Sequence, residues 1–263
     1  MGVHATAIVD PGARLGAGVA IGPFAVVEAD TEIGDGCEIR AHAVVKRFTR
    51  LGRGNVVHEG AVLGGEPQDL AFRGAPSELH IGDGNTIREG VTIHRGTVAG
   101  SATVVGSGCY LMAYSHVGHN DRLADGVIMA NNVLLAGQVD VGERAFLSGG
   151  VVVHQFARIG RLAMVGGNTR ISMDALPFVN TTGFNGCAVG LNVVGLRRAG
   201  LGSSLGTLKR AYRILLRSGL LLSAALEEMA VLRDPLVDEM ITFIRGSKRG
   251  FHRTARASSE APE

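Results

Sequence analysis

The sequence is poor in the residues that build a large irregular core or a disulfide framework. Tryptophan is absent, aromatic residues make up only 5% of the 263 residues, and proline occurs 7 times. Three cysteines form an odd set without a CxxC spacing, which argues against disulfide pairing or a cysteine-rich zinc site. No apolar run approaches the roughly 18 residues of a membrane span, and residues 1–10, MGVHATAIVD, lack the basic and apolar regions expected of a signal peptide. We therefore expect a protein without a transmembrane helix in a reducing, cytoplasmic compartment.

The formal net charge is only +2, so charge alone does not indicate a nucleic acid or a membrane as a partner. Basic residues nevertheless gather in one C-terminal stretch without an acidic residue. They would suit an acidic carrier protein or a diphosphate, and the simpler alternative is a solvated helix face. The residues concerned are Arg197, Arg198, Lys209, Arg210, Arg213 and Arg217.

What the sequence does contain is a strict six-residue repeat. An aliphatic residue recurs at every sixth position from Val3 to Leu63, again from Ile81 to Ile93, and again from Val105 to Ile171. Glycine often follows this anchor residue, and small residues recur four positions after it. An α-helix would require a period near 3.6 residues and a simple strand a period of 2, so neither explains the pattern.

A period of six instead indicates short parallel strands joined by tight turns, with three sides and eighteen residues in each coil of a solenoid. We predict an all-β parallel β-helix over residues 1–176. The repeat fails at about 64–80 and 94–104, and we expect two loops there. Loops on rigid scaffolds often carry function.

The part after Ile171 reads differently. We expect an irregular connection over 177–202, a small helical domain over 203–246 and a disordered tail over 247–263. The predicted caps are Ser203 or Ser204 for the first helix, Ser223 for the second, and Asp234, followed by a proline, for the third.

Two histidines, His116 and His119, lie in the most regular part of the repeat. His119 is the third residue of its hexad, at or near a turn, where it can face a cleft. A neutral imidazole there could take a proton from a hydroxyl group that attacks a thioester. That reaction needs an oxyanion donor such as a backbone N–H and no metal, and no serine or cysteine lies in a nucleophile motif. A surface histidine without a role is the alternative.

Several motifs resemble those of the UDP-N-acetylglucosamine O-acyltransferases of lipid A biosynthesis, and the resemblance covers nearly the whole chain. These motifs are EPQDLAFRG at 66–74, IREGVTIHRGT at 87–97, HVGH at 116–119, MANNVLLAG at 129–137, VHQF at 153–156, MVGGN at 164–168 and GLNVVGLRR at 190–198.

The resemblance implies a left-handed parallel β-helix with a small C-terminal α-helical domain. It also implies a homotrimer with active sites between neighbouring solenoids, in the cytoplasm of a Gram-negative bacterium. The implied reaction transfers a 3-hydroxyacyl chain from acyl carrier protein to the 3-hydroxyl of UDP-N-acetylglucosamine, the first step of lipid A biosynthesis. No metal or cofactor takes part in it.

The resemblance also assigns roles to single residues. His119 matches the general base, and Gly137 matches the residue whose backbone N–H binds the oxyanion. Gly167 matches a position that limits acyl length, where glycine leaves room for a long chain. The positions that match the sugar-nucleotide and acyl sites are Gln68, Asp69, His94, His116, Gln138, His154, Gln155, Asn192 and Arg198.

The chain departs from the family pattern at five positions. Asn120 replaces an aspartate after the base, Gln138 replaces a histidine after the oxyanion glycine, and Ala71 replaces a lysine. Val194 and Ala199 replace a polar and a basic residue. These changes leave open a relative that acylates another nucleotide sugar, including one with a 3-amine. Two further alternatives are a zinc-dependent hydratase on the same fold and a scaffold without enzymatic activity.

Overall fold

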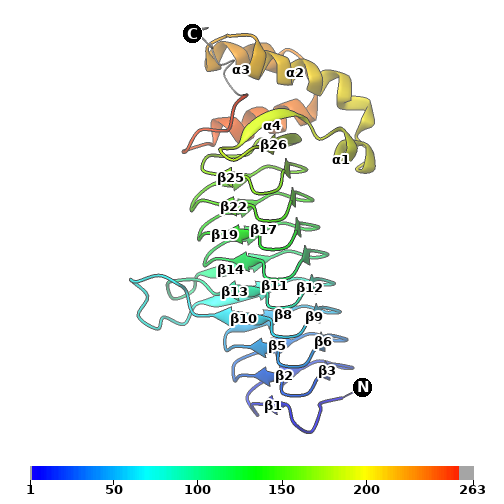
Figure 1. Cartoon of the computed structure of the whole chain (residues 1–263), viewed down its shortest axis with the longest axis vertical. Helices are drawn as coiled ribbons and strands as arrows, with labels where there is room; N and C mark the ends of the chain where they lie inside the picture. Colours follow the sequence, from blue (N-terminus) through cyan, green and yellow to red (C-terminus); the bar gives the residue numbers. More distant parts are fainter. Residues whose placement is uncertain (1, 255–263) are drawn as a thin grey trace, which may run out of the picture.

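The computed structural model describes residues 2–254 of the chain. They form a tall solenoid of short strands that begins at the N-terminus and ends under a group of helices (Figure 1). Each turn of the solenoid contributes one strand to each of three sheets, which we name A, B and C. The parallel β-helix predicted from the six-residue period is present.

Within residues 2–254, sheet B has 9 strands and sheet C has 8. The strands of sheet B are β1 (Ile8–Val9), β4 (Val26–Val27), β7 (Val44–Val45), β10 (Val62–Gly65), β13 (Thr92–His94), β16 (His116–Val117), β19 (Leu134–Leu135), β22 (Val152–Val153) and β25 (Arg170–Ile171). Those of sheet C are β2 (Arg14–Leu15), β5 (Glu32–Ile33), β8 (Thr49–Leu51), β11 (Glu78–Ile81), β14 (Ala102–Val105), β17 (Arg122–Leu123), β20 (Asp140–Val141) and β23 (Arg158–Ile159).

Sheet A has 10 strands in the described part of the chain. They are β3 (Ala20–Ile21), β6 (Glu38–Ile39), β9 (Val56–Val57), β12 (Thr86–Ile87), β15 (Tyr110–Leu111), β18 (Ile128–Met129), β21 (Phe146–Leu147), β24 (Met164–Val165), β26 (Val179–Thr182) and β27 (Cys187–Leu191). All pairs in the three sheets are parallel except β26 with β27.

The anchor residues point into the solenoid and stack from coil to coil. Val27 pairs with Val45, for example, and both are almost completely buried. Burial is weaker only at the first coil, where Val3 is 50% exposed, because no coil lies beneath it. Each buried aliphatic side chain contributes about 1.5–3 kcal/mol relative to an exposed one, which explains why the period is kept so strictly.

The corners between the sheets share one backbone conformation. The residue three positions after an anchor has a positive φ, and this position is glycine in many hexads. Asn120, with φ 62°, and Gln138, with φ 60°, occupy it at successive coils. Asparagine enters this left-handed region more readily than most residues do. Two of the five departures from the family pattern therefore lie at corners, where they leave the strands unchanged.

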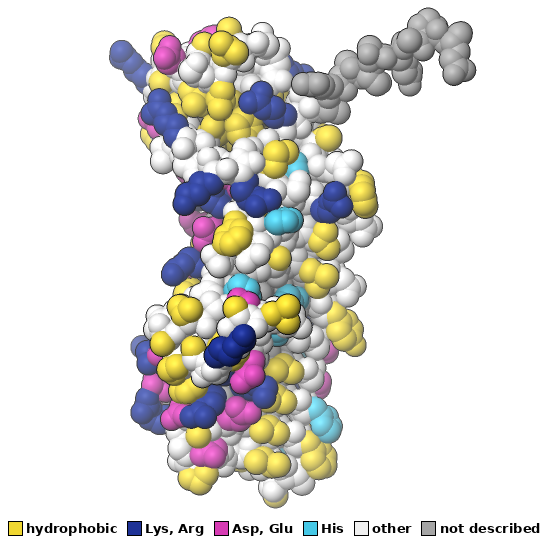
Figure 2. Space-filling view, turned by 90° about the vertical axis from the view of Figure 1, so that its left-hand side faces the viewer, with side chains coloured by type: hydrophobic (Ala, Val, Ile, Leu, Met, Phe, Trp, Pro, Cys, Tyr) yellow, Lys and Arg dark blue, Asp and Glu magenta, His cyan; other side chains and the backbone are white. Residues whose placement is uncertain are grey.

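The three faces of the solenoid differ in chemistry. The outward side chains of sheet C are largely charged, and include Arg14, Glu32, Arg50, Arg122, Asp140 and Arg158. Those of sheets A and B are largely apolar, and include Val26, Val44, Val62, Leu134 and Val152 on sheet B and Ile128, Phe146 and Met164 on sheet A. Figure 2 shows acidic and basic side chains mixed along one flank and hydrophobic side chains along the other.

Two loops leave the solenoid where the repeat fails. They span 66–77, between β10 and β11, and 95–101, between β13 and β14 (Figure 1). Arg95 joins them to the solenoid, because its guanidinium lies 5.5 Å from the ring centroid of Phe48 and 5.4 Å from that of Phe72. Such contacts stabilise a desolvated arginine. Both predicted loops are present and are shorter than expected.

The segment 177–202 is not an irregular connection, as the sequence suggested. It contains β26, β27 and a short helix α1 (Val193–Arg198). β26 pairs with β24 in parallel and β27 returns antiparallel to it, so the hairpin covers the open end of the solenoid. The six-residue period cannot reveal an antiparallel hairpin, which explains the error.

The helical domain comprises α2 (Leu205–Arg217), α3 (Leu222–Ala230) and α4 (Pro235–Arg245), preceded by a 3-10 turn at Gly202–Ser204. Asp234 caps α4 through a 2.9 Å bond from the Leu236 N–H, as predicted. Ser204 occupies the N-cap of α2 without a side-chain bond. Ser223 is not a cap, because α3 begins one residue before it. None of the described helices is long and apolar enough to cross a membrane.

These helices have their own hydrophobic core, separate from that of the solenoid, with Phe178, Leu196 and Met240 fully buried in it. Residues 247–254 are not a disordered tail: Phe251 and His252 are buried, and the His252 N–H donates to the Asp174 carbonyl. The rest of the predicted tail, 255–263, lies outside the described residues.

Candidate active site

The corner between β16 and β17 carries His119, and the same corner of the next coil carries Gly137. The two residues are directly opposed: a Cβ added at Gly137 would overlap the His119 imidazole. The Gln138 N–H donates to the His119 carbonyl at 2.9 Å and joins the two turns. Glycine at 137 is therefore a steric requirement of a buried His119, which is only 9% exposed.

Asn120 contacts the His119 ring from the side. Its Oδ1 lies 3.1 Å from Nδ1 of His119. The same oxygen accepts a 3.2 Å bond from the Thr97 N–H and a 3.0 Å bond from the Thr97 hydroxyl. The Asn120 N–H donates to the Thr103 hydroxyl at 2.7 Å. The side-chain oxygen of Asn120 thus has three polar neighbours, and one of them is the imidazole of His119.

Asp121 fixes the corner from inside the solenoid. It is fully buried, and its two carboxylate oxygens accept bonds from the Gly118 N–H at 2.7 Å and the Val139 N–H at 2.8 Å. Burial raises the pKa of Asp121 well above its usual value, although these two donors oppose the shift. The carboxylate ties the turn of His119 to the turn that follows Gly137, and it does not contact the imidazole.

A cavity of about 420 Å³ opens beside this corner. Leu134 and Val152, which point outward from sheet B and are 44% and 36% exposed, form an apolar wall next to His116. The predicted site residues that line the cavity are Gln68, His94, His116, His119, Gly137 and Gln155. Its combination of one apolar wall and a few polar groups is typical of a small-molecule site.

His94 and His116 stack edge to face in the cavity wall, with ring centroids 4.8 Å apart. Burial, with the nearby His116 and His119, lowers the pKa of His94 to about 4. Burial also lowers the pKa of His116, whose Nδ1 lies 2.7 Å from the Thr92 hydroxyl. Both rings are therefore neutral at pH 7 and can donate or accept single hydrogen bonds to a bound substrate.

Three other predicted site residues, Gln138, His154 and Asp69, do not line the cavity. Gln138 and Asn120 border a second hollow of about 890 Å³ on the sheet C side. His154 is exposed, and its Nδ1 bonds to the Gln155 carbonyl at 3.0 Å. Asp69 forms a turn within its loop, because its Oδ1 accepts the Ala71 N–H at 2.8 Å.

Gly167, Asn192 and Arg198 do not line this cavity in the single chain. Asn192 caps α1, accepting the Gly195 N–H at 2.9 Å, and its amide nitrogen donates to the Leu162 carbonyl. Arg198 is exposed in the last turn of α1. The sequence had given no role to Thr97 or Thr92, because single threonines in these segments carry no pattern.

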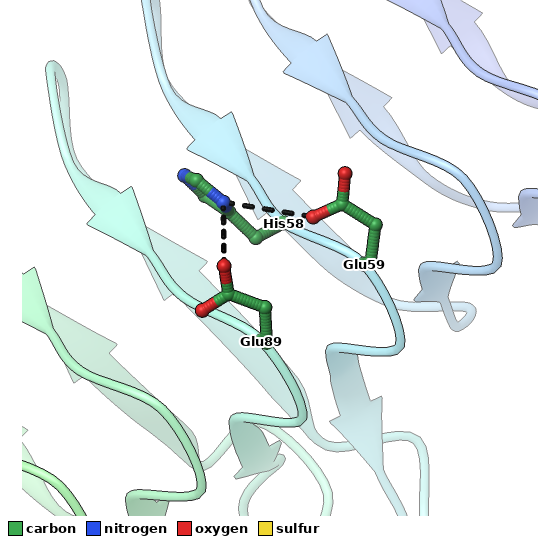
Figure 3. A group of neighbouring side chains, drawn as sticks. All are labelled: His58, Glu59 and Glu89. Atoms are coloured by element: carbon green, nitrogen blue, oxygen red, sulfur yellow. Dashed lines mark ion pairs between the residues drawn. The ribbon is translucent and has the colours of Figure 1, made fainter.

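In the described residues, one group of histidine and acidic side chains brings its potential metal ligands within 4.8 Å of one another: His58, Glu59 and Glu89 (Figure 3). Nδ1 of His58 lies 3.4 Å from Glu89 and 3.6 Å from Glu59. Arg40 approaches the same nitrogen at 3.1 Å.

Arg88 also binds both oxygens of Glu89 and, through these hydrogen bonds, lowers the pKa of Glu89 to about 2. The protein's own cations therefore occupy this cluster, and we interpret it as an ion-pair network. His94, His116 and His119 form no such group within the described chain.

Residues 174–252 match the family described as UDP N-acetylglucosamine O-acyltransferase, domain 2, and residues 12–47 match the bacterial transferase hexapeptide family (six repeats). The chain is 44% identical over 257 residues to the acyl-[acyl-carrier-protein]–UDP-N-acetylglucosamine O-acyltransferase of Anaeromyxobacter dehalogenans (strain 2CP-1), a match that covers 96% of this chain and 100% of that protein. It is 48% identical over 251 residues to the enzyme of the same name from Alkalilimnicola ehrlichii, covering 94% of this chain and 97% of that one.

Solved structures give the same result. The UDP-N-acetylglucosamine acyltransferase of Bacteroides fragilis superposes with a TM-score of 0.93 at 38% identity, covering 95% of this chain and 99% of that structure. The likeness confirms the predicted fold class, a left-handed parallel β-helix with a small C-terminal helical domain.

Proposed function

Since this chain belongs to the family of acyl-[acyl-carrier-protein]–UDP-N-acetylglucosamine O-acyltransferases, we propose that it works through His119 as general base and Gly137 as oxyanion donor. The enzyme transfers a 3-hydroxyacyl chain from acyl carrier protein to the 3-hydroxyl of UDP-N-acetylglucosamine, the first step of lipid A biosynthesis. The observation that carries the residue assignment is the direct opposition of the two residues on successive coils.

The geometry suits acyl transfer. A sugar hydroxyl placed in the cavity would give its proton to the imidazole as its oxygen attacks the thioester carbonyl. The Gly137 N–H has no acceptor among the described residues, whereas the N–H groups of Ala136 and Gln138 on either side are both bonded. A free, fixed N–H is the group that a developing oxyanion requires. The carrier's thiol leaves with the proton that the imidazole had taken.

The substrates would bind along the cavity. We assign Gln68, His94, His116 and Gln155 to the sugar and acyl groups, because these side chains surround the His119–Gly137 corner. The apolar wall of Leu134 and Val152 suits the start of an acyl chain. We propose Gln138, Asp69 and His154 as peripheral contacts.

Self-association would complete the site. Charged side chains cover sheet C, whereas apolar side chains cover sheets A and B, so burial of sheets A and B between copies would be favourable. If the outer face of sheet A in one copy packed against the outer face of sheet B in the next, a closed ring of three copies would bury all of these apolar faces. We propose this homotrimer, in which a neighbouring copy supplies Gly167, Asn192 and Arg198.

The acyl carrier protein would dock on the helical domain, in the cytoplasm. The side chains of Lys209, Arg210, Arg213 and Arg217 on α2, and of Arg197 and Arg198 on α1, are all exposed. An acidic carrier would be attracted to such a surface.

An acyl-transfer assay tests the assignment. It would cross carrier-linked chains of several lengths with UDP-N-acetylglucosamine and its 3-amino analogue. We expect turnover of UDP-N-acetylglucosamine without added metal, and a loss of about 10²–10⁴-fold in kcat for His119→Ala. His4→Ala, which changes an exposed histidine near the N-terminus, is the matched control. Preference for the 3-amino analogue would indicate a relative that acylates another nucleotide sugar. A requirement for added metal would favour the zinc-dependent hydratase. A fully active His119→Ala variant would mean that another residue is the base.

A further inference from the structure

We propose that Thr97 is a positioning residue, which holds the amide of Asn120 so that the neutral His119 ring keeps its proton on Nδ1 and presents the lone pair of Nε2. Thr97 lies in the 95–101 loop, at one of the two places where the repeat is broken. The role of Nε2 in catalysis rests on the proposed function. The position of the proton rests on the hydrogen bonds alone.

The orientation of the Asn120 amide follows from the Thr97 backbone. A backbone N–H can only donate, so the Asn120 atom 3.2 Å from it must be the oxygen. The Thr97 hydroxyl contacts the same atom at 3.0 Å. An amide nitrogen in this place would face the N–H donor without an acceptor. The usual ambiguity between the two ends of an asparagine amide is therefore resolved by a neighbour.

The orientation of the Asn120 amide determines which nitrogen of the His119 ring carries the proton. Nδ1 lies 3.1 Å from an oxygen that can only accept, so Nδ1 must carry the proton. In a neutral imidazole the other nitrogen, Nε2, then has a free lone pair. The ring cannot turn away easily, because its other side lies against Gly137. The tautomer needed by a general base is thus present before substrate binds.

This device orients the base without adding a charge. Asn120 is neutral, and the nearest carboxylate in sequence, Asp121, directs both oxygens to the backbone of Gly118 and Val139. Thr97 can hold Asn120 only if the 95–101 loop is itself fixed, and two backbone hydrogen bonds fix the start of this loop to β10 and β11. Arg95 N–H donates to the Gly65 carbonyl at 3.0 Å, and Gly96 N–H to the Glu78 carbonyl at 3.2 Å.

The test combines kinetics with ¹⁵N NMR of histidine-labelled protein. Thr97→Val removes the hydroxyl and keeps the backbone N–H, and Thr97→Ser restores the hydroxyl. We expect Thr97→Val to lower kcat about 3- to 10-fold, the effect of one hydrogen bond, with KM within twofold, and Thr97→Ser to recover most of the loss. Ser101→Ala is the matched control, because Ser101 bonds to Val98 within the same loop and not to Asn120. It should keep the wild-type kcat.

The NMR spectra should show His119 of the wild type protonated on Nδ1, with a smaller Nδ1–H fraction in Thr97→Val and the smallest in Asn120→Ala. A wild-type ring protonated on Nε2 would overturn the proposal, as would a Thr97→Val protein with unchanged kcat and tautomer. Equal losses in Thr97→Val and Ser101→Ala would also overturn it, because the loop would then act as a whole. The spectra do not depend on turnover, so an inactive wild type with the expected tautomer would refute the proposed function alone.

Discussion

The imidazole of His119 lies against the α-carbon of Gly137, one coil away, and no side chain fits between them. A flat ring and a residue without a Cβ are complementary here. This contact fixes the distance between the His119 imidazole and the backbone N–H of Gly137, which has no acceptor among the described residues, on a scaffold whose coils hold each other in register.

Gly137→Ala should therefore inactivate the protein without unfolding it. The closest atoms to the new methyl group all belong to the His119 ring, so the ring must move while the backbone stays. A displacement near 1 Å costs about 100-fold in rate, and we expect at least this loss in kcat.

Gly149→Ala is the control for this prediction, because its methyl group would meet only the Asn131 carbonyl oxygen, at 3.4 Å. It should remain active. A Gly137→Ala enzyme with wild-type kcat would show that the ring does not act from this position.

Asn120→Asp should change the pH profile of kcat/KM. A carboxylate beside Nδ1 favours the imidazolium, which cannot act as a base, so the acid limb of the profile should move to higher pH, by about 1–2 units. The measurement is kcat/KM between pH 5 and 9 for both proteins. An acid limb that stays in place would mean that position 120 does not face the base in solution.

Asp121→Asn should destabilise the fold. An amide has one acceptor oxygen, so one of the buried N–H groups of Gly118 and Val139 would lose its acceptor, at a cost of about 1–3 kcal/mol. Urea unfolding measures this cost.

The cost should also depend on pH. Because burial raises the pKa of Asp121, the folded protein retains a proton that the unfolded chain loses above pH 3.8. The contribution of Asp121 to stability therefore decreases as pH rises, and the difference from Asp121→Asn should be smaller at pH 8 than at pH 4. A difference that grows with pH would show that the two N–H donors outweigh burial.

His94 should make the protein less stable in mild acid. Its pKa is lowered to about 4 in the folded protein, whereas an unfolded histidine titrates near 6.5, so the unfolded chain binds more protons between these values. Stability is lost as pH falls through this window. We expect His94→Gln to show a smaller fall in Tm between pH 7 and pH 5 than the wild type. An identical fall in both proteins would mean that His94 titrates normally.

Phe146→Asp should disrupt self-association. Phe146 points outward from sheet A between Ile128 and Met164, and a carboxylate in this apolar strip would be desolvated without a partner. Sedimentation should show a trimer for the wild type and smaller species for the variant. Arg122→Glu changes the charged face of sheet C and should remain trimeric; dissociation of that variant instead would locate the interface on sheet C.

The sequence predicted the repeat and the C-terminal helices, and it missed the contacts of the loops and the β26–β27 hairpin. Because His119 and Gly137 are eighteen residues apart, their contact could be inferred from the period alone. The contact between Thr97 and Asn120 could not, since Thr97 follows a break in the period and the path of a loop depends on packing such as that of Arg95 against Phe72. The hairpin of β26 and β27 was not predicted either, because it too lies outside the six-residue period.

The positive φ shared by the corners has a further consequence. Each coil raises the solenoid by about 4.8 Å, the spacing between neighbouring strands, and coils of equal length have the same backbone conformation. Deleting one whole coil between β19 and β25 would bring α2 closer to His119 by the height of one coil. The orientation of α2 about the solenoid axis would stay the same. The distance between the proposed docking surface for the acyl carrier protein on α2 and the His119–Gly137 corner can therefore change only in steps of one coil, and the number of coils sets it.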